Sequence, residues 1–517
     1  MKLGRVDQLD RKKIDSAIEA LLAYSSSPRI PRTGDMEHLS ARDYGDMLAL
    51  VHLWGRLRLA ESILGHLKGS KVGFDVSEMV KVMVLNRLSD PLSKLGLMRW
   101  IPTVFIPELK EDVSYPHLLR AMDYLVEIKE EVERDLYNEL VNLFSLEVDV
   151  VFMDLTSCYF EGEGPELAKW GYSRDKRPDR KQIVLALVVS NEGLPIYHEV
   201  LPGNTADVTT LVPTVEVLRS RFRIGRCILV CDRGMVSEDN LAYLDEHKIP
   251  YIVAIRRRGT KESDELISKT LRGFVEMEDL GLRVKEKAQG DTRYILCHNP
   301  EMAKKKKEIR EEFFKKAHGE IDKLNRRFLK GGLTPESLYH KAMEVLENYN
   351  LEKYFSPKVE KPGVILYTNT DLLERERFLE GKFFLKTKLT AEEITTPEVI
   401  RTYKALSEIE RAFRTLKDPL RLRPIFHWTD RRVRAHVMIC VLAYLLEKMV
   451  GIYCERAKLN LSPRRALGLL SQLKAIHTRL GNHSLVVTTT IQQRMREILD
   501  AAKIPMPEKV IETQLLT

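Results

Sequence analysis

The sequence predicts an α/β protein: a central region with a mixed sheet, interrupted by a strand-containing insertion and flanked by helical N- and C-terminal regions. Three observations support this. From Val148 onward, short β-branched apolar runs bounded by Gly, Pro and Asn replace the helical periodicity of the preceding residues. Helical periodicity returns at about residue 391. The chain of 517 residues is also longer than one compact core usually organises, which favours several domains.

Composition indicates an ordinary globular protein with a local preference for polyanions. The chain is 44% hydrophobic and 31% charged, with a net charge of +8. Between Arg411 and Arg434, eight basic residues stand against two acids, a local net of +6 that favours nucleic acid. The six cysteines show neither a disulfide framework nor zinc-ligand spacing, so we expect a reducing, cytoplasmic location. The longest apolar run, Val437 to Leu446, is too short to span a bilayer, and we predict no membrane partner.

Residues 1–145 are predicted to form a helical N-terminal DNA-binding region. Amphipathic patterns cover residues 10–24 and 78–90, and residues 115–144 have the pattern of two successive helices. A turn-rich segment at residues 25–35 follows the first of these. Basic helical hairpins suit DNA binding, although a plain helical scaffold fits the same pattern. No single recognition helix is distinguished.

Residues 146–258 are predicted to form the first part of the sheet domain. Candidate strands cover residues 148–154, 181–190, 194–203, 227–232 and 251–257, and helices are expected within residues 207–222 and 237–248. We expect the first three strands to form an antiparallel meander.

Residues 259–390 are predicted to be an insertion, and residues 391–450 to complete the sheet domain. Residues 303–330 carry eleven bases and five acids at helical spacing, and strands are expected at 363–369 and 381–388. A helix then begins with Thr396 as N-cap and Pro397 at its first position, and Pro419 ends it. An apolar helix follows at 433–450, and residues 451–517 are predicted to be a helical C-terminal region.

Three acidic residues form the candidate catalytic set. Asp154 and Asp232 each follow an apolar strand, where a carboxylate must be solvated, paired or bound to metal. Glu410 lies on a helical stripe beside an apolar stripe that would pack on the sheet. If the two strands are parallel neighbours, the three acids converge. The members of the charged stripe are Tyr403, Leu406, Glu410, Arg414 and Lys417, and those of the apolar stripe are Ile409, Phe413, Leu416 and Leu420.

The three converging acids indicate a two-metal site. Oxygen ligands without His or Cys select Mg²⁺ or Mn²⁺. Two such ions about 4 Å apart support phosphodiester displacement. Arg411, Arg414 and Lys417 would then hold phosphates.

These residues resemble the DDE triad of insertion-sequence transposases, which have a ribonuclease H-like core. Asp154, Asp232 and Glu410 stand in the family's order. The helix is similar to the family motif Y-x2-R-x3-E-x6-K, with Tyr403, Glu410 and Lys417 at the motif's spacing and Leu406 where Arg is expected. Further similarity covers residues 171–207, 231–244 and 423–447.

The resemblance implies a bacterial or archaeal enzyme that cleaves DNA at terminal inverted repeats and joins the 3′ ends to target DNA. It implies that the three acids bind the metal ions, that Tyr403 and Lys417 contact phosphates, and that a homodimer pairs the two ends. Arg411, Arg414 and Arg233 complete the candidate DNA-binding set. Location at the nucleoid in a prokaryotic cytoplasm follows. The family also implies an insertion between Asp232 and Glu410, and 410 − 232 gives a separation of 178 residues.

Three alternatives are weighed against this interpretation. A phosphatase of the haloacid dehalogenase type needs a second acid two residues after the strand-terminal Asp, and Thr156 occupies that position. A nuclease without strand-transfer activity would have the same sequence features. A non-catalytic DNA-binding descendant is disfavoured because all three acids are present.

Overall fold

The computed structural model describes residues 36–110, 112–144, 148–222, 224, 227–255, 273–480 and 483–515. The helix predicted at 10–24 and the turn at 25–35 lie outside these ranges. The chain divides into two compact units. Unit 1 comprises residues 1–139, 418–422 and 431–517. Unit 2 comprises residues 140–417 and 423–430.

Unit 1 is mainly helical, as predicted, and the two successive helices α6 and α7 are confirmed. Asp75 caps α4 by accepting a hydrogen bond from the Glu78 amide, and Ser114 caps α6 in the same way. Its helices are α2 (Gly45–Arg56), α3 (Leu59–His66), α4 (Val76–Ser89), α5 (Leu97–Trp100), α6 (Tyr115–Glu127), α7 (Lys129–Phe144, which continues into unit 2), α16 (Asp430–Arg456), α17 (Pro463–Leu470) and α18 (Gln493–Ala501).

Unit 1 also contains a sheet that the sequence analysis missed. The prediction of a helical C-terminal region holds for α17 and α18 but is wrong for the residues between and after them. Four antiparallel strands pair in the order β1-β13-β14-β15, so strands distant in sequence complete one sheet. They are β1 (Met36–Asp43), β13 (Lys474–Leu480), β14 (His483–Thr488) and β15 (Val510–Leu515).

Helix α16 is the longest apolar element of unit 1. By length and composition alone it could cross a membrane, and 89% of its most apolar window is buried inside the fold. A helix that is hydrophobic on all sides is typical of a protein core as well as of a bilayer.

Unit 2 is built on a nine-stranded sheet in the order β4-β3-β2-β5-β6-β12-β9-β8-β7. The predicted meander is confirmed, because β2, β3 and β4 pair antiparallel. Strand β5 then lies parallel to both β2 and β6, which gives the mixed sheet expected of a ribonuclease H-like core. The strands are β2 (Val150–Tyr159), β3 (Gln182–Ser190), β4 (Pro195–Pro202), β5 (Ile228–Cys231), β6 (Tyr251–Ala254), β7 (Val275–Met277), β8 (Leu282–Gln289), β9 (Thr292–His298) and β12 (Lys382–Thr387).

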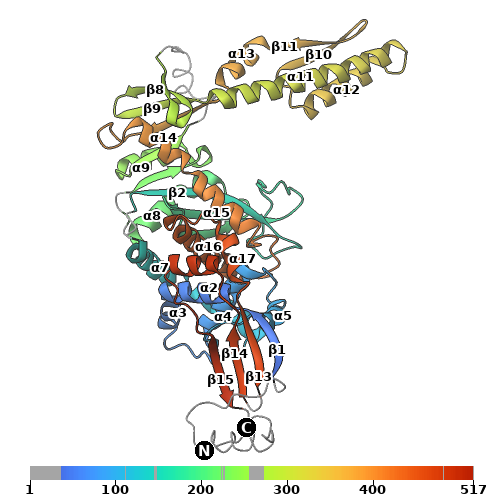
Figure 1. The fold of residues 1–517 in the computed structure, drawn as a ribbon. Coiled ribbons are helices and arrows are strands. Elements are labelled where there is room, and N and C mark those ends of the chain that lie inside the picture. The colour runs from blue at the N-terminus through green and yellow to red at the C-terminus, as the bar shows by residue number, and fades with distance from the viewer. Residues whose placement is uncertain are drawn as a thin grey trace, which may run out of the picture. The chain divides into compact units, whose positions relative to one another are not determined.

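One part of the insertion extends this sheet, and another part forms a separate subdomain. Strands β7, β8, β9 and β12 extend the sheet, whereas a separate insertion subdomain, residues 300–379, packs around its own apolar core. Figure 1 shows its long helix alongside the second helix and the strand pair. The basic segment at 303–330 is helical, as predicted. The subdomain's elements are α11 (Pro300–Leu329), α12 (Pro335–Asn348), β10 (Phe355–Glu360), β11 (Gly363–Thr368) and α13 (Thr370–Leu379).

Four further helices belong to the part of unit 2 that carries the candidate site. Helices α8 (Leu211–Arg221) and α9 (Glu238–Glu246) follow the predicted positions. The helix predicted to run unbroken to Pro419 is instead two helices, α14 (Thr396–Lys404) and α15 (Ser407–Lys417), separated by a turn at Ala405 and Leu406. The N-cap is Thr395, in a capping box with Glu398, and not Thr396 as predicted.

Candidate active site

Strand register places the first two acids side by side. The last paired residues of β2 and β5 are Met153 and Cys231, so Asp154 and Asp232 follow on the next rung of a parallel pair. The prediction that both strands end at their aspartates is correct only for β5. Strand β2 continues to Tyr159, because β3 pairs with it along its whole length. Asp154 is thus held inside a strand, whereas Asp232 begins a short turn.

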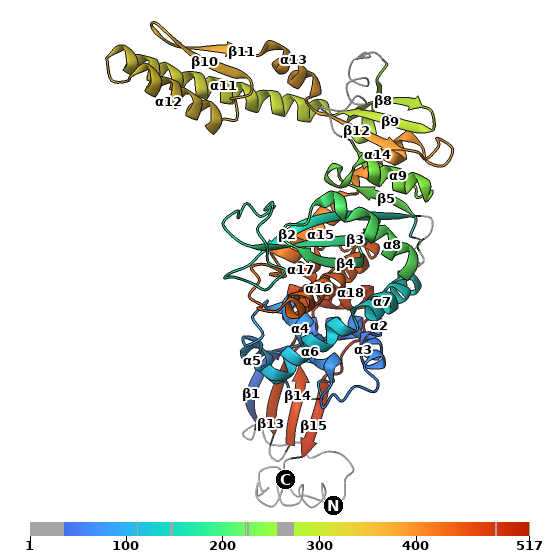
Figure 2. The ribbon, with the colours of Figure 1, turned by 180° about the vertical axis from the view of Figure 1, so that it is seen from behind.

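Helix α15 brings the third acid to this edge. Its apolar stripe is buried, with Ile409 and Leu416 fully buried and Phe413 nearly so. That stripe packs on β2 and β3, and both views show α15 against β2 (Figures 1 and 2). Glu410 is exposed next to Ile409. Both Asp232 and Glu410 act electrostatically on Asp154, so the structure brings the three predicted acids together.

Asp154 occupies a position that disfavours its own charge. Burial, together with the negative charges of Asp232 and Glu410, raises the pKa of this carboxyl to about 7. The Leu155 amide donates a hydrogen bond of 2.7 Å to Asp154 Oδ1, and Arg174 is a nearby cation. Both lower the pKa without offsetting the burial. Such a strongly shifted acid in an acidic cluster is typical of a functional site.

The donor set fits a divalent cation chemically. Its three carboxylates are hard oxygen ligands, and positive charge placed among them would relieve the repulsion that Asp154 experiences. Within the described ranges, no three His, Cys, Asp or Glu side chains are close enough to hold a metal ion as they stand. The three carboxylates are therefore near enough to repel one another, but their side chains would have to move closer together to coordinate one metal ion.

Tyr403 lies beside the acids although it belongs to a different helix from Glu410. Burial raises the pKa of its hydroxyl, and Asp232 and Glu410 add to that effect. Its ring lies 6.1 Å from that of Phe383, centroid to centroid, in a stacked arrangement. Leu406, where the resembled motif has Arg, is 8% exposed at the turn between α14 and α15. This leucine is packed into the fold and offers no phosphate contact.

The predicted DNA-binding cations differ in their surroundings. Arg414 is exposed on α15, and the exposed Arg411 forms an ion pair with Glu408 one turn earlier. Lys417 donates a 2.8 Å hydrogen bond to Asp175, a carboxylate that also pairs with Arg423. The side chain of Asp175 is only 4% exposed, so Lys417 belongs to a buried ion-pair network in this structure.

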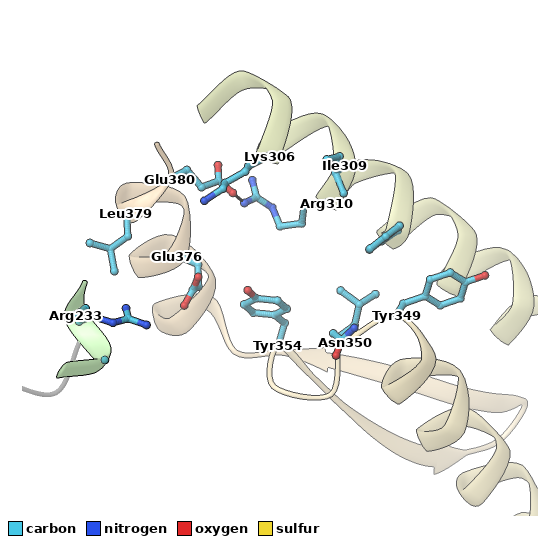
Figure 3. A pocket seen from close by; sticks show the side chains of 13 residues that line it. Arg233, Lys306, Ile309, Arg310, Tyr349, Asn350, Tyr354, Glu376, Leu379 and Glu380 are labelled. Atoms are coloured by element: carbon cyan, nitrogen blue, oxygen red, sulfur yellow. Dashed lines mark ion pairs between the residues drawn. The ribbon is translucent and has the colours of Figure 1, made fainter. Parts of the chain in front are cut away.

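Arg233, the remaining predicted DNA-binding residue, faces a cavity of about 740 Å³. Figure 3 shows its side chain directed toward the insertion subdomain, whose helices provide the other walls. Arg310 forms an ion pair with Glu380 at one end of this cavity. The lining combines cations, acids and rings: Arg233, Lys306, Arg310, Glu376, Glu380, Phe313, Tyr349 and Tyr354.

Two site residues were missed by the sequence analysis. Arg174 acts electrostatically on Asp154, its backbone amide donates to Ser157 Oγ at 2.8 Å, and its guanidinium pairs with Asp207. A Cβ at Gly234, two residues after Asp232, would lie 3.1 Å from Asp207, which places this pair near both aspartates. Both residues fall within the 171–207 stretch of family resemblance, but nothing in their spacing singled them out.

An acid cluster at the edge of a mixed sheet, with cations on the adjoining helix, is an arrangement typical of proteins that act on phosphodiesters. Comparison with known families makes this specific. The family model described as "Transposase DDE domain" matches residues 147–446, more than half of the chain. The protein belongs to this transposase family. The matched region contains all three acids.

Two solved structures with detectable similarity are transposase complexes. A piggyBac transposase synaptic complex with hairpin DNA matches at 10% identity and a TM-score of 0.39, covering 86% of this chain and 82% of that one. The Mos1 transposase paired-end complex matches at 16% identity and a TM-score of 0.15, covering 49% and 69%. A search of curated protein sequences finds no significant match.

Proposed function

We propose that this protein cleaves DNA at the terminal inverted repeats of an insertion sequence and joins the freed 3′ ends to target DNA. The observation that carries the proposal is the meeting of Asp154, Asp232 and Glu410 at one sheet edge within a transposase DDE domain. The proposal includes action as a homodimer on nucleoid DNA in a prokaryotic cytoplasm. Pairing of two DNA ends is the reason for the dimer.

Each acid would have a distinct part in the site. Asp154, fixed within β2, would be one of the ligands of the Mg²⁺ or Mn²⁺ ions. Asp232 and Glu410 are exposed and would provide the remaining carboxylate ligands. When bound, the ions would activate a water or a 3′-hydroxyl and stabilise the leaving oxygen. Arg174, held by Asp207, is placed to orient Asp154 through charge.

The neighbouring residues would hold the DNA strand. Tyr403 lies next to Asp232 and Glu410, and we assign it a contact with the phosphate that neighbours the scissile bond. The exposed Arg411 and Arg414 lie on the same helix as Glu410 and would bind phosphates farther along the strand. Arg233 would act from the opposite side, at the mouth of the cavity. Lys417 would contribute by fixing α15 through Asp175.

The decisive test uses Glu410→Ala. DNA carrying the sequences that flank the coding region is incubated with protein and Mg²⁺, and nicking is measured. We expect cleavage to fall below detection while end binding, measured by fluorescence anisotropy, changes less than about twofold. Glu408→Ala, an acid on the same helix outside the cluster, is the matched control and should cleave normally. Retained cleavage by Glu410→Ala would remove this residue from the mechanism.

A second assay separates transposition from simple hydrolysis. A pre-nicked end with a free 3′-hydroxyl is mixed with target plasmid, protein and Mg²⁺. Joined product is expected for a transposase. If the wild-type protein cleaves ends but never joins them, the nuclease alternative replaces strand transfer.

A further inference from the structure

The exposed Trp and Phe side chains of the described residues lie on two neighbouring loops of unit 2. Every Trp and Phe of the chain lies in the described ranges, and the only exposed ones are Trp170, Phe426 and Trp428. Tyr172 lies in the same place and is 82% exposed. We call these four residues the aromatic platform. Exposed apolar rings gathered at one place are typical of binding surfaces.

The first loop of the platform is rigid. Lys169 exchanges two backbone hydrogen bonds with Gln182, and the buried Gln182 side chain donates to the Tyr172 carbonyl at 3.0 Å. Gly171, between the two rings, packs so closely that a Cβ would lie 2.0 Å from the Gly203 carbonyl oxygen. The backbone therefore presents Trp170 and Tyr172 in a fixed arrangement, which lowers the entropy lost on binding.

The second loop is fastened to the first. Ile425 hydrogen-bonds through its amide to Tyr159 and through its carbonyl to Glu161, and Asp430 accepts a 2.9 Å bond from the Leu167 amide. A Cβ at Gly162 would lie 3.6 Å from the Trp428 ring. Phe426 and Trp428 thus occupy a loop joined on both sides to the segment that precedes Trp170.

The platform adjoins the catalytic acids. The Arg174 guanidinium lies 5.8 Å from the centre of the Tyr172 ring and also acts on Asp154. Asp175, next in sequence, accepts ion pairs from Lys417 of α15 and from Arg423, which begins the second loop. Arg174 thus connects the first loop to the acid cluster, and Asp175 connects both loops to α15.

The charges of the loops indicate which part of a nucleic acid would be bound. Most of the basic side chains in these loops form ion pairs with acidic side chains of the same loops, as in Lys181–Glu163 and Arg177–Asp179. A phosphate would have to compete with these carboxylates for the cations, so the groups that the loops offer without such competition are their exposed rings. Rings bind bases by stacking, and a base can stack on a side chain only when it is unpaired.

We propose that the aromatic platform binds unpaired DNA bases next to the phosphate held at the acid cluster. This rests on the proposed function, because it takes the substrate to be DNA. Stacking is worth about 1–3 kcal/mol per base, so two or three stacked bases would stabilise locally melted DNA at the point of reaction. The platform would select opened DNA, whereas the cations of α15 would bind the backbone irrespective of pairing.

The test compares paired and opened DNA without catalysis. A 30-base-pair duplex with a central four-nucleotide mismatch bubble, containing 2-aminopurine, and the same duplex fully paired are titrated with full-length protein in EDTA. We expect wild-type protein to bind the bubble at least about tenfold more tightly and to quench 2-aminopurine fluorescence. Trp170→Ala/Tyr172→Ala and Phe426→Ala/Trp428→Ala should each lose most of this preference and the quenching, with affinity for paired duplex within about twofold.

Controls separate the possible failures. Tyr339→Ala removes an exposed aromatic of α12 and should retain the preference. Thermal unfolding confirms that the variants are folded. Equal binding of bubble and paired duplex by wild-type protein would overturn the platform, as would unchanged preference in both double variants. Loss of dimer in sedimentation, with bubble preference retained, would assign the rings to a protein interface. Because metal is omitted, these outcomes are independent of whether Glu410→Ala abolishes cleavage.

Discussion

The acid edge of unit 2 and the insertion subdomain use charge in opposite ways. At the acid edge, a buried strand holds Asp154 where burial and two neighbouring acids disfavour its ionisation. In the insertion subdomain, a small apolar core carries the packing, and charged residues such as Lys316 and Glu312 pair on the surface. At the acid edge, the ionised form of Asp154 is unfavourable, and the surrounding structure holds the residue in place. In the insertion subdomain, core packing and surface ion pairs both favour the same fold, as expected of a structural module.

Because of this difference between the two regions, we expect Asp154→Asn to have the largest effect, and the effect should be on activity. Mg²⁺-dependent DNA cleavage should fall by at least about a thousandfold, because a neutral amide is a poor ligand and cannot balance cationic charge. The midpoint of thermal unfolding should not fall, since the substitution removes a like-charge contact. A matched loss of stability and cleavage would show that Asp154 is mainly structural.

The ion-pair network behind the acid edge should be the next most sensitive feature. Asp175→Asn leaves Lys417 and Arg423 without their shared, nearly buried carboxylate. We expect the free energy of unfolding to drop by about 3–5 kcal/mol in chemical denaturation. Asp179→Asn, an exposed acid of the same loop, should leave the free energy of unfolding almost unchanged. Equal effects of the two substitutions would contradict the burial argument.

The insertion subdomain should respond in stability rather than in chemistry. Leu346 is fully buried in its core, and Leu346→Ala should lower local stability by about 2–4 kcal/mol. Hydrogen exchange followed by mass spectrometry should show faster exchange in α11 and α12, with β2 and β5 unchanged. Faster exchange throughout β2 would mean that the two regions unfold together, and the contrast between them would disappear.

We expect the smallest effect, a change in the pH dependence of stability, from Lys382 on β12, the strand that follows the insertion subdomain. Burial lowers the pKa of Lys382 to about 8, although its ammonium lies 3.3 Å from the centre of the Phe378 ring. Between pH 8 and the ordinary lysine pKa the unfolded chain binds more protons, so wild-type stability should rise with pH across that interval. Below pH 8 the cost of burying the charge is fully present.

Lys382→Met should therefore stabilise the protein by about 1–2 kcal/mol at pH 7, with the difference shrinking toward pH 10. Urea denaturation at both pH values measures this. Lys386→Met, on the same strand, is the control for the replacement of a lysine by methionine. A constant difference at all pH values would assign the effect to packing alone.

Local sequence patterns predicted much of this fold and the identity of its acids. Apolar runs ending at Asp154 and Asp232, and the stripe of Ile409 and Phe413 beside Glu410, contained the information because strand and helix periods are intrinsic to the backbone. The same reasoning placed the meander and the basic helix α11 correctly. It failed where distant segments pair: β1 and β13 are more than 400 residues apart in sequence and become strands only in each other's presence.

The sequence alone determined that three acids of the transposase DDE order exist and which faces of their elements are apolar, because side-chain period and hydrophobicity are local properties. Only the tertiary structure decided that Asp154 lies within a strand and that Arg174 and Asp207 join its surroundings. It also decided that Lys417 is occupied by Asp175 and that four aromatic rings adjoin the site. These are consequences of strand register and loop packing, which depend on contacts between residues far apart in the chain.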